Sequence, residues 1–117
     1  MKHTVSMKEN YLFRRLYAKG KSAATAALAV YVRPNHSQRT RLGITVSAKL
    51  GKAVRRNRVR RRIREAYRIH EHQMSPGWDI VVVARTRAVY ASYAEVERAL
   101  LTLLDKLGVR QKAGAGK

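Results

Sequence analysis

The segment from Lys52 to His70 reads KAVRRNRVRRRIREAYRIH, and it decides the fold more than any other stretch. At about 100° per residue, its apolar side chains fall on one stripe. This stripe is formed by Val59, Ile63, Ala66 and His70, with Tyr67 at its edge. The opposite side carries Asn57, Arg61, Arg64 and Arg68, flanked by Arg58 and Arg60. The pattern predicts an amphipathic helix that docks by a narrow face and points a wide cationic arc outward.

The cationic arc has the composition of a surface that contacts a polyanion. The segment from Lys49 to Arg68 contains ten basic residues and a single acidic one, Glu65. Like charges four residues apart cost about 0.2–0.5 kcal/mol each on a helix, so an ordinary solvated face mixes the two signs. A phosphate backbone removes this repulsion and releases counterions. Asn57 offers both a donor and an acceptor, which suits a base edge or a sugar hydroxyl.

The whole chain repeats this charge imbalance. It has 117 residues and a formal net charge of +19, whereas a small domain needs a magnitude of only about 2–8 for solubility. The excess favours a polyanionic partner: nucleic acid, an acidic membrane surface or an acidic protein. The predominance of arginine favours nucleic acid, because guanidinium groups bind phosphate bidentately and stack on bases. We predict one RNA-binding domain over residues 1–109 and a disordered basic tail over 110–117.

Several classes of function are disfavoured by composition. The chain has no cysteine, so it lacks disulfides and thiol nucleophiles, which fits the cytoplasm that we predict. No apolar run approaches the ~18 residues of a membrane span, and residues 1–13 do not resemble a signal peptide. The seven acids are scattered, and His70 and His72 point to different helix faces. We therefore expect no catalytic residue, name no protein ligand set for a metal, and expect neither a membrane nor a small-molecule substrate as partner.

The flanking segments predict the remaining elements. Ser6–Glu9 has the pattern of a capping box that opens a helix over Met7–Lys19, with Gly20 in a left-handed position at its end. Leu28–Arg33 and Arg41–Ser47 alternate as strands, and Lys21–Thr25 is a candidate edge strand.

Two further elements follow the basic helix. Asp79–Ala84 is almost wholly apolar, which is typical of a strand covered on both faces. Ser92–Glu95 is a second capping box, and the helix that it opens ends at Gly108. The order of elements, α-β-β-(β)-α-β-α, predicts an α/β (α+β) two-layer sandwich. If the strands before and after the basic helix are parallel neighbours, general handedness would make their crossover right-handed in ~98% of cases.

The motifs resemble those of the bacterial ribonuclease P protein component. The run GKAVRRNRVRRRIREAY, residues 51–67, is similar to the signature of that family, and LGITVSAKL, residues 42–50, is similar to the strand and loop before it. FRRLYAKG, residues 13–20, resembles the N-terminal helix of the family, and Asp79–Arg85 resembles its last strand. The likeness covers about residues 6 to 108. Ala48 stands where many members have lysine, which removes one phosphate contact.

The resemblance implies a fold like the second domain of ribosomal protein S five, with an unusual left-handed crossover through the basic helix. We adopt that hand over the general preference. It also implies that a large RNA is the catalyst. This RNA removes the 5′ leader of precursor tRNA, with Mg²⁺ held mainly by RNA, and the product carries a 5′-phosphomonoester. The chain would then be the protein subunit of an endoribonuclease, with the catalytic RNA and precursor tRNA as partners.

The resemblance also implies two sets of site residues. The basic helix and the loop before it would bind the RNA subunit through Lys49, Lys52, Arg56, Asn57, Arg58, Arg60, Arg61, Arg64 and Arg68. A cleft between the first helix and the sheet would bind the single-stranded leader through Phe13, Arg14, Tyr17 and Tyr31. Aromatic rings stack unpaired bases without a sequence requirement, as many different leaders demand. The residues alone leave open that the three aromatic side chains simply enter the core.

Three other functions share part of this pattern. A structural ribosomal protein has similar charge but needs no exposed aromatic cleft. A DNA-binding helix-turn-helix module has a short turn between two helices, whereas here the basic helix lies between strands. A free-standing nuclease needs clustered carboxylates, which this chain lacks.

Overall fold

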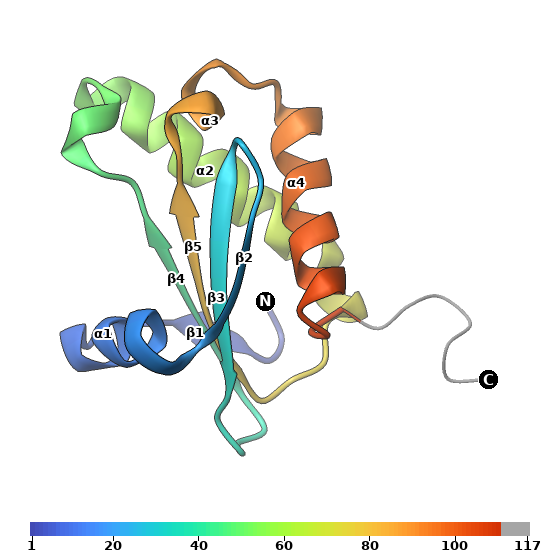
Figure 1. The fold of residues 1–117 in the computed structure, drawn as a ribbon. Helices are drawn as coiled ribbons and strands as arrows, with labels where there is room; N and C mark the ends of the chain where they lie inside the picture. The colour runs from blue at the N-terminus through green and yellow to red at the C-terminus, as the bar shows by residue number, and fades with distance from the viewer. Residues whose placement is uncertain (111–117) are drawn as a thin grey trace.

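The computed structural model describes residues 1–110, which form a five-stranded sheet packed with helices (Figure 1). In chain order the elements are β1 (Thr4–Ser6), α1 (Asn10–Lys19), β2 (Lys21–Ala24), β3 (Leu28–Pro34), β4 (Thr40–Thr45), α2 (Ala53–His70), β5 (Trp78–Ala84), α3 (Thr86–Tyr90) and α4 (Tyr93–Lys106). Short 3₁₀ turns at Ala48–Leu50 and Glu71–Gln73 flank α2.

The strands lie in the order β1-β4-β5-β3-β2, so β5 is central, as its apolar composition predicts. The pairs β1–β4 and β4–β5 are parallel, and the pairs β3–β5 and β2–β3 are antiparallel. The parallel neighbours β4 and β5 are joined through α2, which confirms the expected β-α-β unit. The left hand of its crossover stays a prediction. The edge strand expected near Lys21 is confirmed as β2.

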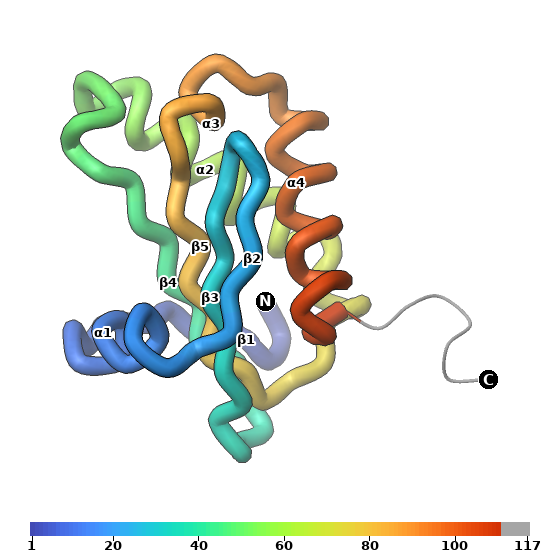
Figure 2. The backbone as a smooth tube through the Cα atoms, viewed as in Figure 1, coloured from blue at the N-terminus to red at the C-terminus, as the bar shows by residue number. Residues whose placement is uncertain are grey.

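Helices lie on both faces of the sheet, and two apolar clusters follow from this. Helices α2 and α4 cover one face and α1 crosses the other (Figure 1 and Figure 2). The larger cluster contains Leu28, Val30 and Val32, which alternate along β3 toward α2 and α4. The smaller cluster is formed by Met7, Leu12, Leu16 and Val81 beneath α1. The mixed α/β architecture predicted from the order of elements is therefore confirmed.

The N-terminal segment differs from the prediction. Ser6 ends strand β1, and α1 begins only at Asn10 with no side-chain cap, so the predicted capping box at Ser6–Glu9 is wrong. Strand pairing prevails over the local motif because β1 finds parallel partners along β4, and the Met7 amide donates to the Leu42 carbonyl at 2.9 Å. Short capping motifs are overridden by such tertiary pairing.

The two glycines expected at helix ends behave differently. Gly108 lies just after α4, as predicted, and has a φ of +82°. Gly20 has a φ of −76°, so its predicted left-handed conformation is wrong. A glycine is needed at this position because the chain packs closely there: a Cβ would lie 2.7 Å from the Leu16 carbonyl oxygen. The capping box at the start of α4 is confirmed: the Glu95 amide donates to Ser92 Oγ at 3.1 Å, and the Ser92 amide donates to Glu95 Oε1 at 3.0 Å.

Two features near the C-terminal end were not anticipated. Helix α3 precedes α4 and was not predicted. Arg110, which we placed in the tail, pairs with Met74 as an isolated bridge and donates to Gln73 Oε1 at 2.8 Å and Asp105 Oδ2 at 3.1 Å. Its assignment to a disordered tail is therefore wrong, and residues 111–117 of that predicted tail lie outside the described residues.

Candidate nucleic-acid interface

The apolar stripe of α2 docks on the rest of the protein as its periodicity predicts. Val59, Ile63, Ala66 and Tyr67 are buried in the larger core cluster. His70 lies at the margin of this contact, where its Nε2 is 2.8 Å from Glu97 Oε2 on α4. Burial of this stripe sets the rotation of α2 about its axis, so the basic side chains of the opposite arc necessarily face outward.

The residues predicted to bind the RNA subunit gather on this outward arc. Most are exposed, and two are half-buried, Arg56 and Arg60. Arg58, Arg61 and Arg64 form no hydrogen bond or ion pair with any residue in the described range 1–110. Lys49 lies in the turn before α2, and Lys52 is the N-cap residue of the helix. The arc thus holds several cations with no internal counter-charge, as a phosphate-binding surface requires.

Four of the predicted residues do have internal partners. Arg68 donates two hydrogen bonds to Glu65, at 2.9 and 2.7 Å, and these raise the pKa of Arg68 and lower that of Glu65. Arg56 Nε donates to the Gly51 carbonyl at 3.1 Å, and Arg60 donates to Asn57 Oδ1 at 3.3 Å. The charge of Arg68 is therefore already compensated, and its predicted role in RNA binding is the least supported of the set.

On α1, the aromatic side chains of Phe13 and Tyr17 are more exposed than the neighbouring leucines. Leu12 and Leu16 are 2% and 1% exposed and belong to the core, whereas Tyr17 is 43% exposed. The Tyr17 ring packs edge-to-face on the Tyr31 ring, with centroids 5.0 Å apart, and its hydroxyl hydrogen-bonds to Thr45 Oγ1 at 3.2 Å.

Phe13 is half-buried over β4, where a Cβ on Gly43 would lie 2.6 Å from its ring. Arg14, the fourth residue predicted for this cleft, is exposed beside it on α1. The structure thus arranges the aromatic rings along the surface between α1 and the sheet, with part of each ring accessible. We call this group of Phe13, Tyr17 and Tyr31 the aromatic cleft.

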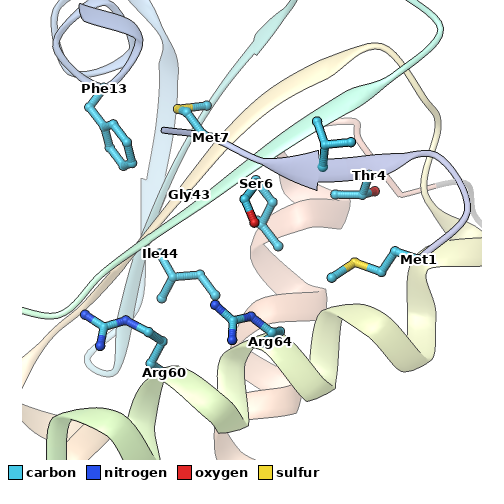
Figure 3. Close-up of a pocket in the computed structure, with 11 residues that line it drawn as sticks. Met1, Thr4, Ser6, Met7, Phe13, Gly43, Ile44, Arg60 and Arg64 are labelled. Atoms are coloured by element: carbon cyan, nitrogen blue, oxygen red, sulfur yellow. The ribbon is translucent and has the colours of Figure 1, made fainter. Parts of the chain in front are cut away.

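A cavity of about 180 Å³ lies between Phe13, at one end of the aromatic cleft, and the basic helix (Figure 3). Phe13 lies on one side of it, and Arg60 and Arg64 lie on the other. Strand β1, the residue Met7 that follows it and strand β4 complete the walls, through residues that include Ser6, Gly43 and Ile44. A second hollow of about 420 Å³ continues along α2, lined by Val54, Asn57, Arg60, Arg61 and Arg64. Phe13 of the first predicted set and Arg60 and Arg64 of the second therefore line the same cavity.

Gly43, Thr45 and the residues of β1 were missed as members of this site. Gly43 carried a usable signal, since a glycine inside an alternating strand often marks a close approach. Thr45 and β1 carried none, because their contacts join segments far apart in the chain.

The side chains of residues 1–110 do not assemble an all-protein Mg²⁺ site. No three His, Cys, Asp or Glu residues in this range lie close enough to hold a metal ion. The most buried carboxylates are already engaged. Asp79 accepts from Arg41 at 2.7 and 2.9 Å and from Asn35 at 3.0 Å, and Glu71 accepts the amides of Lys2 and His3 at 2.7 and 3.2 Å.

Among the helices of residues 1–110, none is long and apolar enough to cross a membrane.

Comparison with known proteins shows which family the chain is similar to. The chain matches the Ribonuclease P family model over residues 1–108. It is 44% identical to the ribonuclease P protein component of Desulfosudis oleivorans, over 84% of this chain and 81% of the relative. It is 42% identical to that of Alkaliphilus oremlandii, over 97% and 99%.

Solved structures of proteins from the same family superpose on this chain. The RNase P protein of Staphylococcus aureus superposes with a TM-score of 0.83 at 36% identity, over 91% of this chain and 97% of that one. The RNase P protein from Thermotoga maritima superposes with a TM-score of 0.74 at 35% identity, over 80% and 89%. With the sequence and the fold in agreement, the chain belongs to the ribonuclease P protein family.

Proposed function

We propose that this chain is the protein subunit of a bacterial ribonuclease P, which binds the catalytic RNA through α2 and the 5′ leader of precursor tRNA in the aromatic cleft. The observation that carries the proposal is the cavity that Phe13 shares with Arg60 and Arg64. A protein that must hold a leader beside a catalytic RNA needs both surfaces adjacent, and this cavity connects them.

The two surfaces would contribute differently to binding. The arc of α2 offers unpaired cations, which supply affinity for an RNA backbone without reading its sequence. The aromatic cleft offers ring faces, and stacking contributes about 1–3 kcal/mol per base with little sequence preference. Such tolerance suits a subunit that meets many leaders.

The protein itself would supply no catalytic group, and the RNA subunit would carry the chemistry together with its Mg²⁺. The role of the protein is then electrostatic and positional. Its net charge of +19 reduces the repulsion between two RNA molecules, so less Mg²⁺ is needed to bring them together. The proposed place of action is the bacterial cytoplasm.

Reconstitution with a bacterial ribonuclease P RNA tests this function. Cleavage of leader-bearing precursor tRNA is measured across a Mg²⁺ titration, with and without the protein. We expect the protein to restore cleavage at low Mg²⁺ and the Arg56→Ala, Arg58→Ala double variant to lose that effect. A protein that leaves the Mg²⁺ requirement unchanged contradicts the proposal. A protein that binds RNA tightly without restoring cleavage indicates a ribosomal or general RNA-binding function.

A further inference from the structure

Helix α3 holds one exposed tyrosine in a fixed position beside the start of α2. Ala88 and Ala91, on either side of Tyr90, are buried in the larger core cluster. Arg62 Nη1 also donates to the Ala91 carbonyl at 2.7 Å, which ties the end of α3 to α2. Tyr90 itself is 70% exposed. Its backbone is therefore anchored while its ring is left in solvent.

The space beside this ring is a cationic hollow. A cavity of about 220 Å³ is lined by Tyr90, Val89, Arg55 and Arg58. Arg55 and Arg58 are three residues apart, so both point from the same side of α2 toward α3. Both are exposed, and neither has a hydrogen bond or ion pair within residues 1–110. Tyr90 likewise has no hydrogen bond, ring contact or cation–π contact within that range.

This combination has the chemistry of a nucleotide site. An aromatic face offers stacking to any base, and adjacent cations neutralise the flanking phosphates. Arginine is suited to both tasks because its planar fork binds phosphate bidentately. The hollow also continues the cationic arc of α2 onto α3, so an RNA chain bound along α2 can reach it. Neither Tyr90 nor Arg55 belongs to the two sets of residues described above.

We propose that Tyr90, Arg55 and Arg58 form a binding site for one unpaired nucleotide of RNA, with the base stacked on Tyr90 and its phosphates contacted by the two arginines. This site rests on the proposed RNA-binding function and adds a third contact to it. The nucleotide comes either from the catalytic RNA or from the precursor tRNA, and the chemistry of recognition is the same for both.

Two binding measurements on the full chain test the site. The first is the affinity of the protein for a labelled ribonuclease P RNA, and the second is the affinity of the reconstituted holoenzyme for precursor tRNA. Tyr90→Ala should weaken one of them by about fivefold to a hundredfold, the range expected for one stacked base. Tyr90→Phe should retain most of the affinity because the ring does the stacking. Arg55→Gln should lower the salt dependence, the slope of log affinity against log salt, by about 0.7–0.9 for one lost phosphate contact.

Tyr11→Ala is the matched control, since Tyr11 is also an exposed tyrosine but lies on α1. The melting temperature of each variant confirms that it folds. Loss in the first measurement assigns the nucleotide to the catalytic RNA, and loss in the second alone assigns it to precursor tRNA. If Tyr90→Ala matches the Tyr11→Ala control in both, the site does not exist. An Arg61→Ala, Arg64→Ala variant separates the two proposals: if it weakens RNA binding and Tyr90→Ala does not, only the Tyr90 site is wrong.

Discussion

Helices α1 and α2 lie on opposite faces of the same sheet, and they present their functional side chains by different means. Helix α2 separates a buried apolar stripe from a broad cationic arc, so its function is a sum of many similar charges. Helix α1 alternates core leucines with surface aromatics, and each ring depends on one specific neighbour, such as Gly43 beneath Phe13. The first surface should therefore lose function gradually under mutation, and the second should lose it at single positions.

The largest expected effect comes from the buried side of α1. Leu16→Ala removes a side chain that is 1% exposed, and we expect the free energy of unfolding to fall by about 2–5 kcal/mol. Arg64→Ala, on the exposed arc of α2, should change it by less than about 0.5 kcal/mol. Denaturant titration of both variants measures the difference. Equal losses would mean that the arc is part of the folded core.

The next effect concerns the arc itself. The Arg61→Ala, Arg64→Ala variant removes two cations that lack internal partners, so the slope of log affinity against log salt should decrease by about 1.4–1.8. Arg68→Ala should change this slope much less, because Glu65 already compensates its charge. Titration of ribonuclease P RNA at several salt concentrations gives both slopes. A larger decrease for Arg68→Ala would show that the Glu65 pair opens on binding.

A smaller and more selective effect is expected in the aromatic cleft. Gly43→Ala places a Cβ 2.6 Å from the present position of the Phe13 ring, which must then move. We expect the holoenzyme to lose affinity for leader-bearing precursor tRNA by up to the ~1–3 kcal/mol of one stacked base, while its affinity for leaderless tRNA is unchanged. Parallel titrations of the two substrates test this. Equal losses for both substrates would mean that Phe13 does not contact the leader.

The last effect concerns Glu71, in the 3₁₀ turn after α2, whose carboxylate accepts the amides of Lys2 and His3 just before β1. Burial opposes ionisation of Glu71, but hydrogen bonds from Thr4 and from the amides of Lys2 and His3 lower its pKa overall. The Glu71 carboxylate therefore stabilises the fold at pH values above its ordinary pKa of 4.5. This stabilisation is lost as the pH falls through the lower pKa of the folded state. Glu71→Gln should cost about 1–3 kcal/mol at neutral pH and progressively less as the pH falls below the ordinary pKa of 4.5.

Thermal unfolding of Glu71→Gln and the unmodified chain across this pH range provides the comparison. A difference between the two proteins that stays constant down to the lowest pH would contradict the role assigned to the carboxylate.

Several parts of the protein follow from short-range sequence patterns. The rotation of α2 was predictable because Val59 and Ile63 repeat at the helical period within one segment. The central place of β5 was predictable because an uninterrupted apolar strand needs cover on both faces. The cap of α4 was predictable because Ser92 and Glu95 satisfy each other without help from elsewhere.

Other parts depend on contacts between distant segments. The motif at Ser6–Glu9 satisfies the local rule for a cap, yet its first residue pairs with β4 instead. The choice between core and surface for Phe13 and Tyr17 was undecided in the sequence, because both share the same helical spacing as the leucines. It was settled only when Gly43 and Tyr31 were brought against α1.

The sequence by itself determined the chemistry of this protein: its excess of arginine, the face on which that charge gathers and the family to which the motifs belong. These properties depend on residue identity and on spacing within one element, which local geometry converts directly into a surface. The tertiary structure alone decided that Phe13 shares a cavity with Arg60 and Arg64, and that Tyr90 lies beside Arg55. Contacts of this kind, between segments far apart in the chain, depend on strand order and helix packing, which local periodicity does not encode.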